Sequence, residues 1–292
     1  MNGAAGVIGL GIMGGAMARH LVKSGFTVHG FDLSAGAVEA ARADGVETVG
    51  SAAEVAEKAH VIVCSLPSPH ALRAVAEEIA ASSAPACVMM ETSTLGIADK
   101  EAARDIFAQA GHTLLDCPLS GTGQQAQTGD LAVFTSGDED AVRKCIPAIE
   151  AFSREHKYCG PFGNGSRMKF VANHLVTIHN TAAAEAMVLG MKSGLDPHLI
   201  YDVIGSSAAT SRMFQVRGGM MADNNYDNVG MSNRLYQKDL DIITAFASDV
   251  HCPVGLFAAA VQPYRATLEQ GLAEKDTAAV CAVLEDQARV KR

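Results

Sequence analysis

The sequence predicts an α/β fold in which an N-terminal, doubly wound domain is joined by a long helix to an all-α C-terminal domain. Short apolar runs alternate with helical stretches up to about residue 160. A dense group of turn formers, Gly160-Pro161-Phe162-Gly163-Asn164-Gly165, then interrupts this pattern. Beyond it, only helical periodicity continues to Arg292. We therefore place the two domains at residues 1–163 and 164–292.

The strand-like runs of the first domain are mostly apolar throughout, as expected for strands that helices cover on both faces. They span residues 5–8, 27–31, 61–65, 87–91, 113–116, 131–135 and 156–159. Helical segments rich in Ala and Glu lie between them, at 35–44, 52–58, 71–81 and 98–110. This repetition predicts a doubly wound, mainly parallel sheet.

One long helix is expected to begin the second domain. Ser166 can cap a helix that continues to Lys192 and stops at Ser193-Gly194. Its apolar residues are too many for one face, so we expect it to be buried between a domain and a further surface. They are Met168, Val171, Ala172, Leu175, Val176, Ile178, Ala182, Ala183 and Ala186. We therefore expect a homodimer or homotetramer.

The next helix is expected to start at Asp196-Pro197, where the aspartate can cap the helix and the proline suits its first position.

Composition excludes several classes of protein. The formal charge of −9 disfavours nucleic acid as a partner. No apolar run approaches the roughly 20 residues that a membrane helix needs. The first strand is expected near residue 4, which leaves no room for a signal or transit peptide and predicts a cytoplasmic location.

Cysteines and histidines carry no sign of a disulfide framework or a metal site. The cysteines are seven in number, scattered, and never form a CxxC pair, so we expect buried free thiols in a reducing compartment. His174 and His179 share the long helix but are five residues apart, which does not place both on one face. No metal is expected.

A glycine-rich segment, Gly9-Leu10-Gly11-Ile12-Met13-Gly14, lies between a predicted strand and a predicted helix. Such a motif alone is weak, but this context is typical of a Rossmann-like dinucleotide site. Gly9 permits the tight turn, Gly11 lets the backbone approach a pyrophosphate, and Gly14 lets helix and strand pack closely. The helix N-terminus offers unpaired N–H groups to the phosphates.

Asp32 ends the second predicted strand, 23 residues after Gly9. A carboxylate there can accept hydrogen bonds from the adenosine ribose hydroxyls, and it repels a 2′-phosphate. The alternative is that Asp32 caps the following helix, a role that Ser34 could fill equally well. We favour the cofactor role, and hence NAD over NADP.

A second glycine-rich segment, Asp116-Cys117-Pro118-Leu119-Ser120-Gly121-Thr122-Gly123, follows a predicted strand. Consecutive backbone N–H groups in such a loop can form an anion-binding nest, to which Ser120 adds a hydroxyl. Composition alone equally supports an ordinary loop.

Lys169 and Asn173 are four residues apart and project from one face of the long helix. Most helical lysines are solvated. A cation in the first turn, however, opposes the helix dipole, so Lys169 is poorly placed for stability. The dipole, a nearby nicotinamide and partial burial would lower its pKa toward the range useful for proton transfer.

Together these motifs resemble those of the β-hydroxyacid dehydrogenase family, which includes 3-hydroxyisobutyrate and L-threonate dehydrogenases and tartronate semialdehyde reductase. The resemblance rests on the first glycine motif, Ser120-Gly121, Lys169 with Asn173, and Lys238-Asp239-Leu240. It spans essentially the whole chain. It implies an NAD-dependent oxidoreductase that acts on a small hydroxy acid in a cleft between the domains.

The resemblance also implies roles for individual residues. Lys169 would be the catalytic acid/base, and Asn173 would help to position it and the substrate. Ser120, with Gly121 and Thr122, would bind the substrate carboxylate. The nicotinamide side of the cofactor would be lined by Leu66, Pro67 and Thr94 and covered by Lys238.

One position departs from the family pattern, and the role of a second residue stays open. The family usually has Ser-Gly-Gly, where this chain has Ser120-Gly121-Thr122. If residue 122 must adopt a positive φ, threonine would be strained there. Arg212 could pair with a second anionic or hydroxylated group of the substrate, or be a surface arginine.

Three alternatives compete with this interpretation. An NADPH-linked glyoxylate or succinic semialdehyde reductase is disfavoured by Asp32. A non-catalytic NAD-binding regulator is disfavoured because Lys169 and Asn173 are both present. An imine reductase is disfavoured because those relatives usually replace the lysine.

Overall fold

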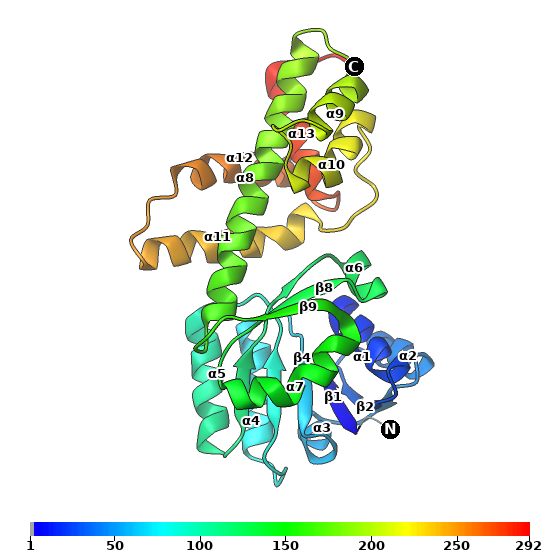
Figure 1. The fold of residues 1–292 in the computed structure, drawn as a ribbon, viewed down its shortest axis with the longest axis vertical. Coiled ribbons are helices and arrows are strands. Elements are labelled where there is room, and N and C mark those ends of the chain that lie inside the picture. Colours follow the sequence, from blue (N-terminus) through cyan, green and yellow to red (C-terminus); the bar gives the residue numbers. More distant parts are fainter. Residues whose placement is uncertain (1–2) are drawn as a thin grey trace. The chain divides into compact units, whose positions relative to one another are not determined.

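The computed structural model describes residues 3–292, and the chain divides into two compact units between Lys169 and Phe170 (Figure 1). One helix, α8 (Asn164–Lys192), runs from the first unit into the second. The domain boundary at residue 163 stays a prediction.

The first unit is built on a six-stranded parallel sheet in the order β3-β2-β1-β4-β5-β6. Its strands are β1 (Ala4–Ile8), β2 (Thr27–Phe31), β3 (Glu47–Thr48), β4 (Val61–Cys64), β5 (Val88–Glu91) and β6 (Thr113–Asp116). The helices that connect them are α1 (Ile12–Lys23), α2 (Ala35–Ala43), α3 (Ala52–Lys58), α4 (Pro69–Ala80) and α5 (Ile97–Gln109). The predicted doubly wound, Rossmann-like fold is confirmed.

Helices cover both faces of this sheet, and each face has its own core. Successive strand residues point to opposite faces. Leu114 therefore packs with residues of α3, α4 and α5, such as Phe107, whereas Leu115 packs with residues of α1 and α7 (Glu139–Phe152), such as Met17. This two-sided burial explains why the strand sequences are apolar throughout.

A second, three-stranded sheet follows β6 in the chain. It consists of β7 (Leu119–Ser120), β8 (Leu131–Thr135) and β9 (Ser153–Tyr158), with β7 antiparallel and β9 parallel to β8. The short helix α6 (Gly123–Thr128) lies between β7 and β8. The runs at 131–135 and 156–159 were expected in the main sheet, and they belong to this second sheet instead.

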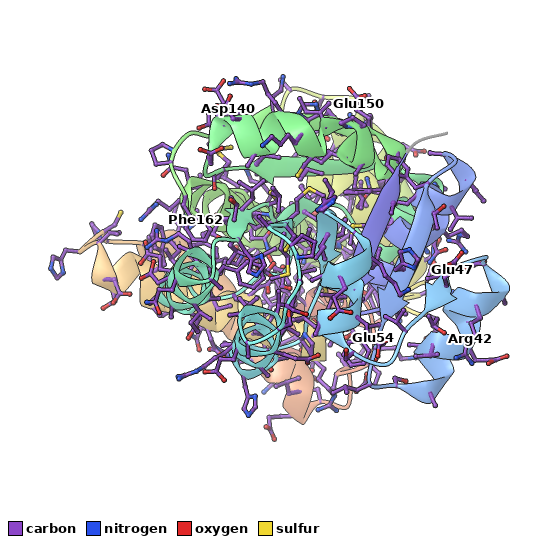
Figure 2. The ribbon with its side chains drawn as sticks, turned by 90° about the horizontal axis from the view of Figure 1, so that it is seen from below. Arg42, Glu47, Glu54, Asp140, Glu150 and Phe162 are labelled. Carbon is purple, nitrogen blue, oxygen red and sulfur yellow. The ribbon has the colours of Figure 1, made fainter. Side chains whose placement is uncertain are left out.

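Charged side chains on the surface of the first unit, among them Glu54, Asp140 and Glu150, are exposed to solvent (Figure 2). Asp140 and Glu150 lie on α7, and Glu54 lies on α3. Arg42 of α2 donates from Nε to the Thr48 hydroxyl over 2.6 Å and so ties that helix to the edge strand β3.

The second unit is helical, as predicted. Beyond α8 it contains α9 (Pro197–Gly205), α10 (Arg212–Asp223), α11 (Asn233–Asp249), α12 (Gly255–Glu269), a short 3₁₀ helix (Thr277–Ala279) and α13 (Val280–Ala288). The predicted cap is confirmed, because the Asp196 carboxylate accepts hydrogen bonds from the backbone N–H groups of His198 and Leu199. Buried polar pairs tie α8 to its neighbours, among them Asn180 with the Tyr264 hydroxyl at 2.8 Å.

The start of α8 differs from the prediction. The helix begins at Asn164, so Ser166 lies inside it and does not cap it. The Asp116 carboxylate, at the end of β6, accepts hydrogen bonds from both the backbone N–H and the hydroxyl of Ser166, each over 2.7 Å. Lys169 is consequently the sixth residue of the helix and lies beyond its first turn. The expected end at Lys192 is confirmed.

None of the helices within residues 3–292 has the length and apolar character needed to span a membrane. All seven cysteines carry free thiols. Five are buried as expected, but Cys159 is partly exposed and Cys252 is exposed, so the expectation of burial is wrong for these two. Their positions at the end of β9 and in the turn before α12 explain this.

Candidate active site

The glycine-rich segment forms the turn between β1 and α1. Gly9 has a φ of +87°, and a Cβ atom there would lie 2.1 Å from the carbonyl oxygen of Ser65. A Cβ atom on Gly14 would lie 1.8 Å from the carbonyl oxygen of Gly9. A Cβ atom on Gly11, by contrast, would meet nothing within 4 Å. The backbone at the N-terminus of α1 therefore faces open space, which fits the pyrophosphate of a dinucleotide.

Asp32 lies directly after β2 and contacts this turn. Its Oδ2 accepts a hydrogen bond from the backbone N–H of Leu10 over 2.6 Å, and its Oδ1 accepts one from Ser34 over 2.7 Å. The cap of α2 is the Ser34 hydroxyl, which accepts from the backbone N–H of Ala37. Leu10 is buried, Met13 is half-buried and Ile12 is exposed.

Leu66, Pro67 and Thr94 follow the carboxyl ends of β4 and β5, the edge at which doubly wound folds bind ligands. The segments are joined, because Leu66 donates from its backbone N–H to the Ser93 hydroxyl over 2.8 Å. The Glu91 carboxylate in turn accepts a hydrogen bond from the backbone N–H of Ser93 over 2.9 Å.

Ser120 ends β7, and the two residues after it differ from the expectation. Gly121 has a φ of +145°, whereas Thr122 has a φ of −94° and caps α6, so the strain considered at Thr122 does not arise. Thr122 forms a capping box with Gln125, in which its backbone N–H donates to Gln125 Oε1 over 3.0 Å. This internal bond competes with any anion for the Thr122 N–H group.

Lys169 and Asn173 are buried, with exposed fractions of 9% and 7%, and lie one turn apart on α8. The Asn173 Nδ2 donates to Asp239 Oδ2 over 2.9 Å, which orients the amide. Asp239 lies on the buried side of α11, directly after the exposed Lys238. The sequence analysis included Asp239 in a motif but assigned it no role. Its position among Tyr236, Leu240 and Ile243 was a usable signal, because an acid within an apolar stripe of a helix is expected to be buried with a polar partner.

Hydroxyl groups support the same turn of α8. Burial raises the pKa of the Tyr236 hydroxyl well above its ordinary value, so it stays protonated. It lies 2.9 Å from the Thr177 hydroxyl and donates to the backbone oxygen of Asn173 over 3.2 Å. Arg212, at the start of α10, is exposed.

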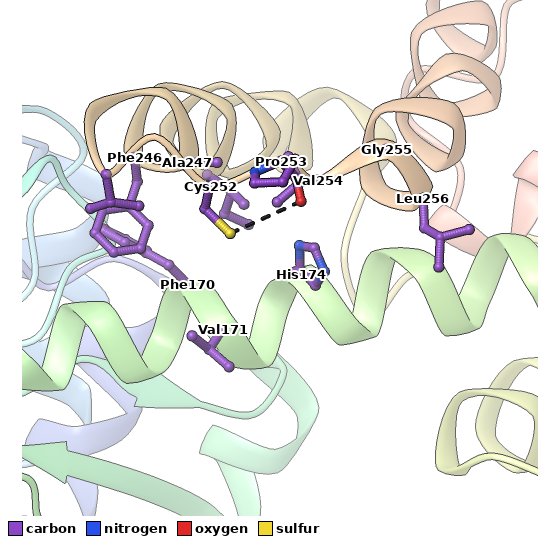
Figure 3. Close-up of a pocket in the computed structure, with 12 residues that line it drawn as sticks. Phe170, Val171, His174, Phe246, Ala247, Cys252, Pro253, Val254, Gly255 and Leu256 are labelled. Carbon is purple, nitrogen blue, oxygen red and sulfur yellow. Dashed lines mark hydrogen bonds between the residues drawn. The ribbon is translucent and has the colours of Figure 1, made fainter.

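An apolar pocket of about 400 Å³ lies in the second unit, beside a different face of α8 (Figure 3). Phe170, Val171 and His174 line it from α8, together with residues of α11, α12 and the turn between them. His174 stacks on Phe257 with ring centroids 5.1 Å apart. Its lining contains no lysine or arginine, so the pocket does not suit the carboxylate of a small hydroxy acid.

The residues between 3 and 292 contain no group of three or more His, Cys, Asp or Glu side chains that could hold a metal ion.

Comparison with known proteins decides the family. A model of the NAD-binding domain of 6-phosphogluconate dehydrogenase matches residues 4–160, and one described as NAD-binding of NADP-dependent 3-hydroxyisobutyrate dehydrogenase matches residues 163–284. The L-threonate dehydrogenase of Cupriavidus necator is 30% identical over 95% of each chain. The chain belongs to the β-hydroxyacid dehydrogenase family.

Other members of the family support this assignment. The NAD-dependent L-serine dehydrogenase of Pseudomonas aeruginosa is 32% identical, over 94% of this chain and 95% of its own. The structure of the Mycobacterium tuberculosis 3-hydroxyisobutyrate dehydrogenase with L-serine is 28% identical, with a TM-score of 0.90 over 97% of this chain and 99% of that one. This member of the β-hydroxyacid dehydrogenase family is an NAD-dependent enzyme acting on CH–OH donors, as expected.

Proposed function

We propose that this dehydrogenase interconverts a small β-hydroxy acid, similar to 3-hydroxyisobutyrate, and its semialdehyde or keto form, with Lys169 as the acid/base. The observation that carries the proposal is the pairing of Lys169 and Asn173. Both side chains are buried on neighbouring turns of α8, and Asp239 holds the Asn173 amide. A buried lysine beside an oriented amide suits proton transfer at a substrate hydroxyl.

A bound nicotinamide dinucleotide supplies the hydride acceptor or donor. During oxidation the neutral Nζ of Lys169 takes the proton of the substrate hydroxyl, and during reduction the ammonium returns it. Asn173 positions the hydroxyl and the lysine. The Ser120 hydroxyl and the backbone at Gly121 bind the carboxylate, and Thr122 shapes this site through its contact with Gln125. Holding the reacting groups in place makes the largest contribution to the rate.

We assign the cofactor contacts as follows. The turn Gly9-Leu10-Gly11-Ile12-Met13-Gly14 binds the pyrophosphate, and Asp32 binds the adenosine ribose, which favours NAD over NADP. The nicotinamide side is lined by Leu66, Pro67 and Thr94 and covered by Lys238. The sequence alone raised alternatives. Asp32 disfavours an NADPH-linked reductase, and the dehydrogenase activity of the family's members disfavours a non-catalytic NAD-binding regulator.

We also propose a cytoplasmic homodimer or homotetramer. The free thiols support a reducing compartment. Self-association is supported by apolar side chains on α8 that are exposed in the single chain, among them Val171, Leu175 and Leu189. The apolar pocket beside Val171 offers a site for a partner's side chain.

The proposal is tested by mixing the enzyme with NAD⁺ and each of a panel of hydroxy acids (3-hydroxyisobutyrate, glycerate, threonate and a hydroxysulfonate) and following the absorbance of NADH. The reverse reaction is followed with the corresponding semialdehydes. We expect turnover of at least one carboxylate substrate. Binding of NADH without turnover of any panel member would contradict the proposed substrate class.

A further inference from the structure

A fully buried ion cluster lies within the first unit, at the carboxyl ends of β5 and β6. Lys100 of α5 has its Nζ 2.6 Å from Glu91 Oε2 and 2.8 Å from Asp116 Oδ1, and none of the three side chains is exposed. On α5, Lys100 occupies the same buried face as Ala103 and Phe107. An apolar residue would normally fill such a position.

The charges of this cluster do not cancel. Burial alone would lower the pKa of Lys100, but the carboxylates of Glu91 and Asp116 raise it above its ordinary value, so the lysine is a cation. One ammonium and two carboxylates leave a formal charge of −1 inside the protein. A buried charge is costly unless hydrogen-bond donors surround it.

The first turn of α8 supplies those donors. The backbone N–H of Ser166 donates to Asp116 Oδ2, and its hydroxyl donates to Asp116 Oδ1, each over 2.7 Å. The Ser136 hydroxyl lies 3.1 Å from Asp116 Oδ2 and accepts a hydrogen bond from the backbone N–H of Gly165 over 2.9 Å. The helix N-terminus and the negative cluster therefore stabilise each other.

Backbone packing fixes the same turn. A Cβ atom on Gly165 would lie 2.4 Å from the carbonyl oxygen of Phe134 and 2.7 Å from that of Asp116. The helix thus starts in direct contact with the ends of β6 and β8. No larger residue fits at this position without displacement of α8.

We propose that this cluster, the α8 anchor (Glu91, Lys100, Asp116, Ser136 and Ser166), positions Lys169 for proton transfer. Lys169 follows Ser166 by three residues and so lies one turn further along the same side of the helix. A misplacement of about 1 Å can cost a reaction two orders of magnitude in rate. This inference rests on the proposed role of Lys169.

The anchor also reaches the cofactor side of the proposed site. The Glu91 carboxylate accepts a hydrogen bond from the backbone N–H of Ser93 over 2.9 Å. The Ser93 hydroxyl in turn accepts a hydrogen bond from the backbone N–H of Leu66 over 2.8 Å. One buried cluster therefore holds both the segment that we assign to the nicotinamide and the helix that carries the acid/base.

Two substitutions perturb the anchor mildly. Ser166→Ala removes the bond from the hydroxyl and retains the backbone bond to Asp116, and we expect kcat to fall roughly tenfold with an unchanged Kd for NADH. Gly165→Ala should lower kcat further, because α8 must move. Gly205→Ala is the matched control, since a Cβ atom at this helical glycine meets nothing within 4 Å, and its kcat should equal that of the wild type.

A double-mutant cycle separates positioning from general damage. In a Lys169→Ala background, Ser166→Ala should change the residual kcat by less than about twofold, because its effect acts through the lysine. An equal fall in both backgrounds, or an unchanged kcat in Ser166→Ala alone, would overturn the anchor while the role of Lys169 stands. A Lys169→Ala variant with wild-type kcat would overturn the proposed function itself.

Discussion

Asp32 is the residue on which we expect the preference between NAD and NADP to depend. Its carboxylate accepts hydrogen bonds from the backbone of Leu10 and Ser34, so it is held close to the glycine turn. A 2′-phosphate placed beside a fixed carboxylate suffers charge repulsion that a free hydroxyl does not. The position of Asp32 thus gives the predicted preference a physical basis.

We expect kcat/KM to be at least about tenfold higher with NAD(H) than with NADP(H), which corresponds to roughly 1.4 kcal/mol. Replacing Asp32 with Ser and the neighbouring, 93% exposed Leu33 with Arg should shift the preference toward NADP(H). Steady-state rates with both cofactors measure this. Equal use of the two cofactors by the wild type would contradict it.

Residue roles that depend on distant partners were the hardest to predict. Ser166 has the sequence context of a helix cap, but Asp116, 50 residues earlier, supplies the acceptor and the helix begins sooner. Thr122 looks strained only if its φ is positive, and Gly121 takes that conformation instead. The role of Lys100, by contrast, could have been predicted from the sequence. A lysine within the apolar stripe of α5 is buried, and a buried lysine needs carboxylate partners.

Elements were predictable where burial imposes a strong pattern. The apolar runs that became β1, β2, β4, β5 and β6 are strands enclosed on both faces. By contrast, β3 and β7 have two residues each, which is too few for a periodicity to appear. The helical spacing of α7 was present in the sequence, but Pro147 interrupts it. The alternation of strands and helices also gave no sign that β8 and β9 leave the main sheet.

Exposed apolar residues on helix α8 are the observation that supports the proposed self-association. Its residues Ala183, Ala184 and Met187 are buried, whereas Val171, Leu175 and Leu189 on another side are exposed. Exposed apolar residues in a continuous stripe are typical of a surface that a partner covers. The expectation that this helix is buried on several sides is thus met only in part by the single chain.

Light scattering at micromolar concentration should give a mass at least twice the 30.4 kDa of one chain. Leu175→Glu, at a leucine that is 47% exposed, should shift the enzyme toward monomers without unfolding it, because it places a charge in the proposed contact between subunits. Leu33→Glu, at an exposed leucine outside this stripe, is the control and should keep the wild-type mass. A monomeric wild type would contradict the proposal.

At the scale of the whole molecule, a cofactor-binding α/β unit and a helical unit are encoded in one chain, and α8 belongs to both. The turn at Gly9 and the carboxyl edge of the sheet provide the proposed cofactor contacts. The second unit provides Asn173, oriented by Asp239. Lys169 is the last residue of the first unit in the chain, and we propose that it transfers the proton of the reaction.

The kinetics of Lys169 variants test this account most directly, with the best substrate of the panel and NADH binding followed by fluorescence. We predict that Lys169→Ala lowers kcat by about 10²–10⁴, the usual range for loss of a general acid/base, while the Kd for NADH barely changes. Lys169→Arg should lower kcat almost as much, because a guanidinium does not release its proton near neutral pH. A Lys169→Ala enzyme that keeps more than about a tenth of the wild-type kcat would contradict the mechanism.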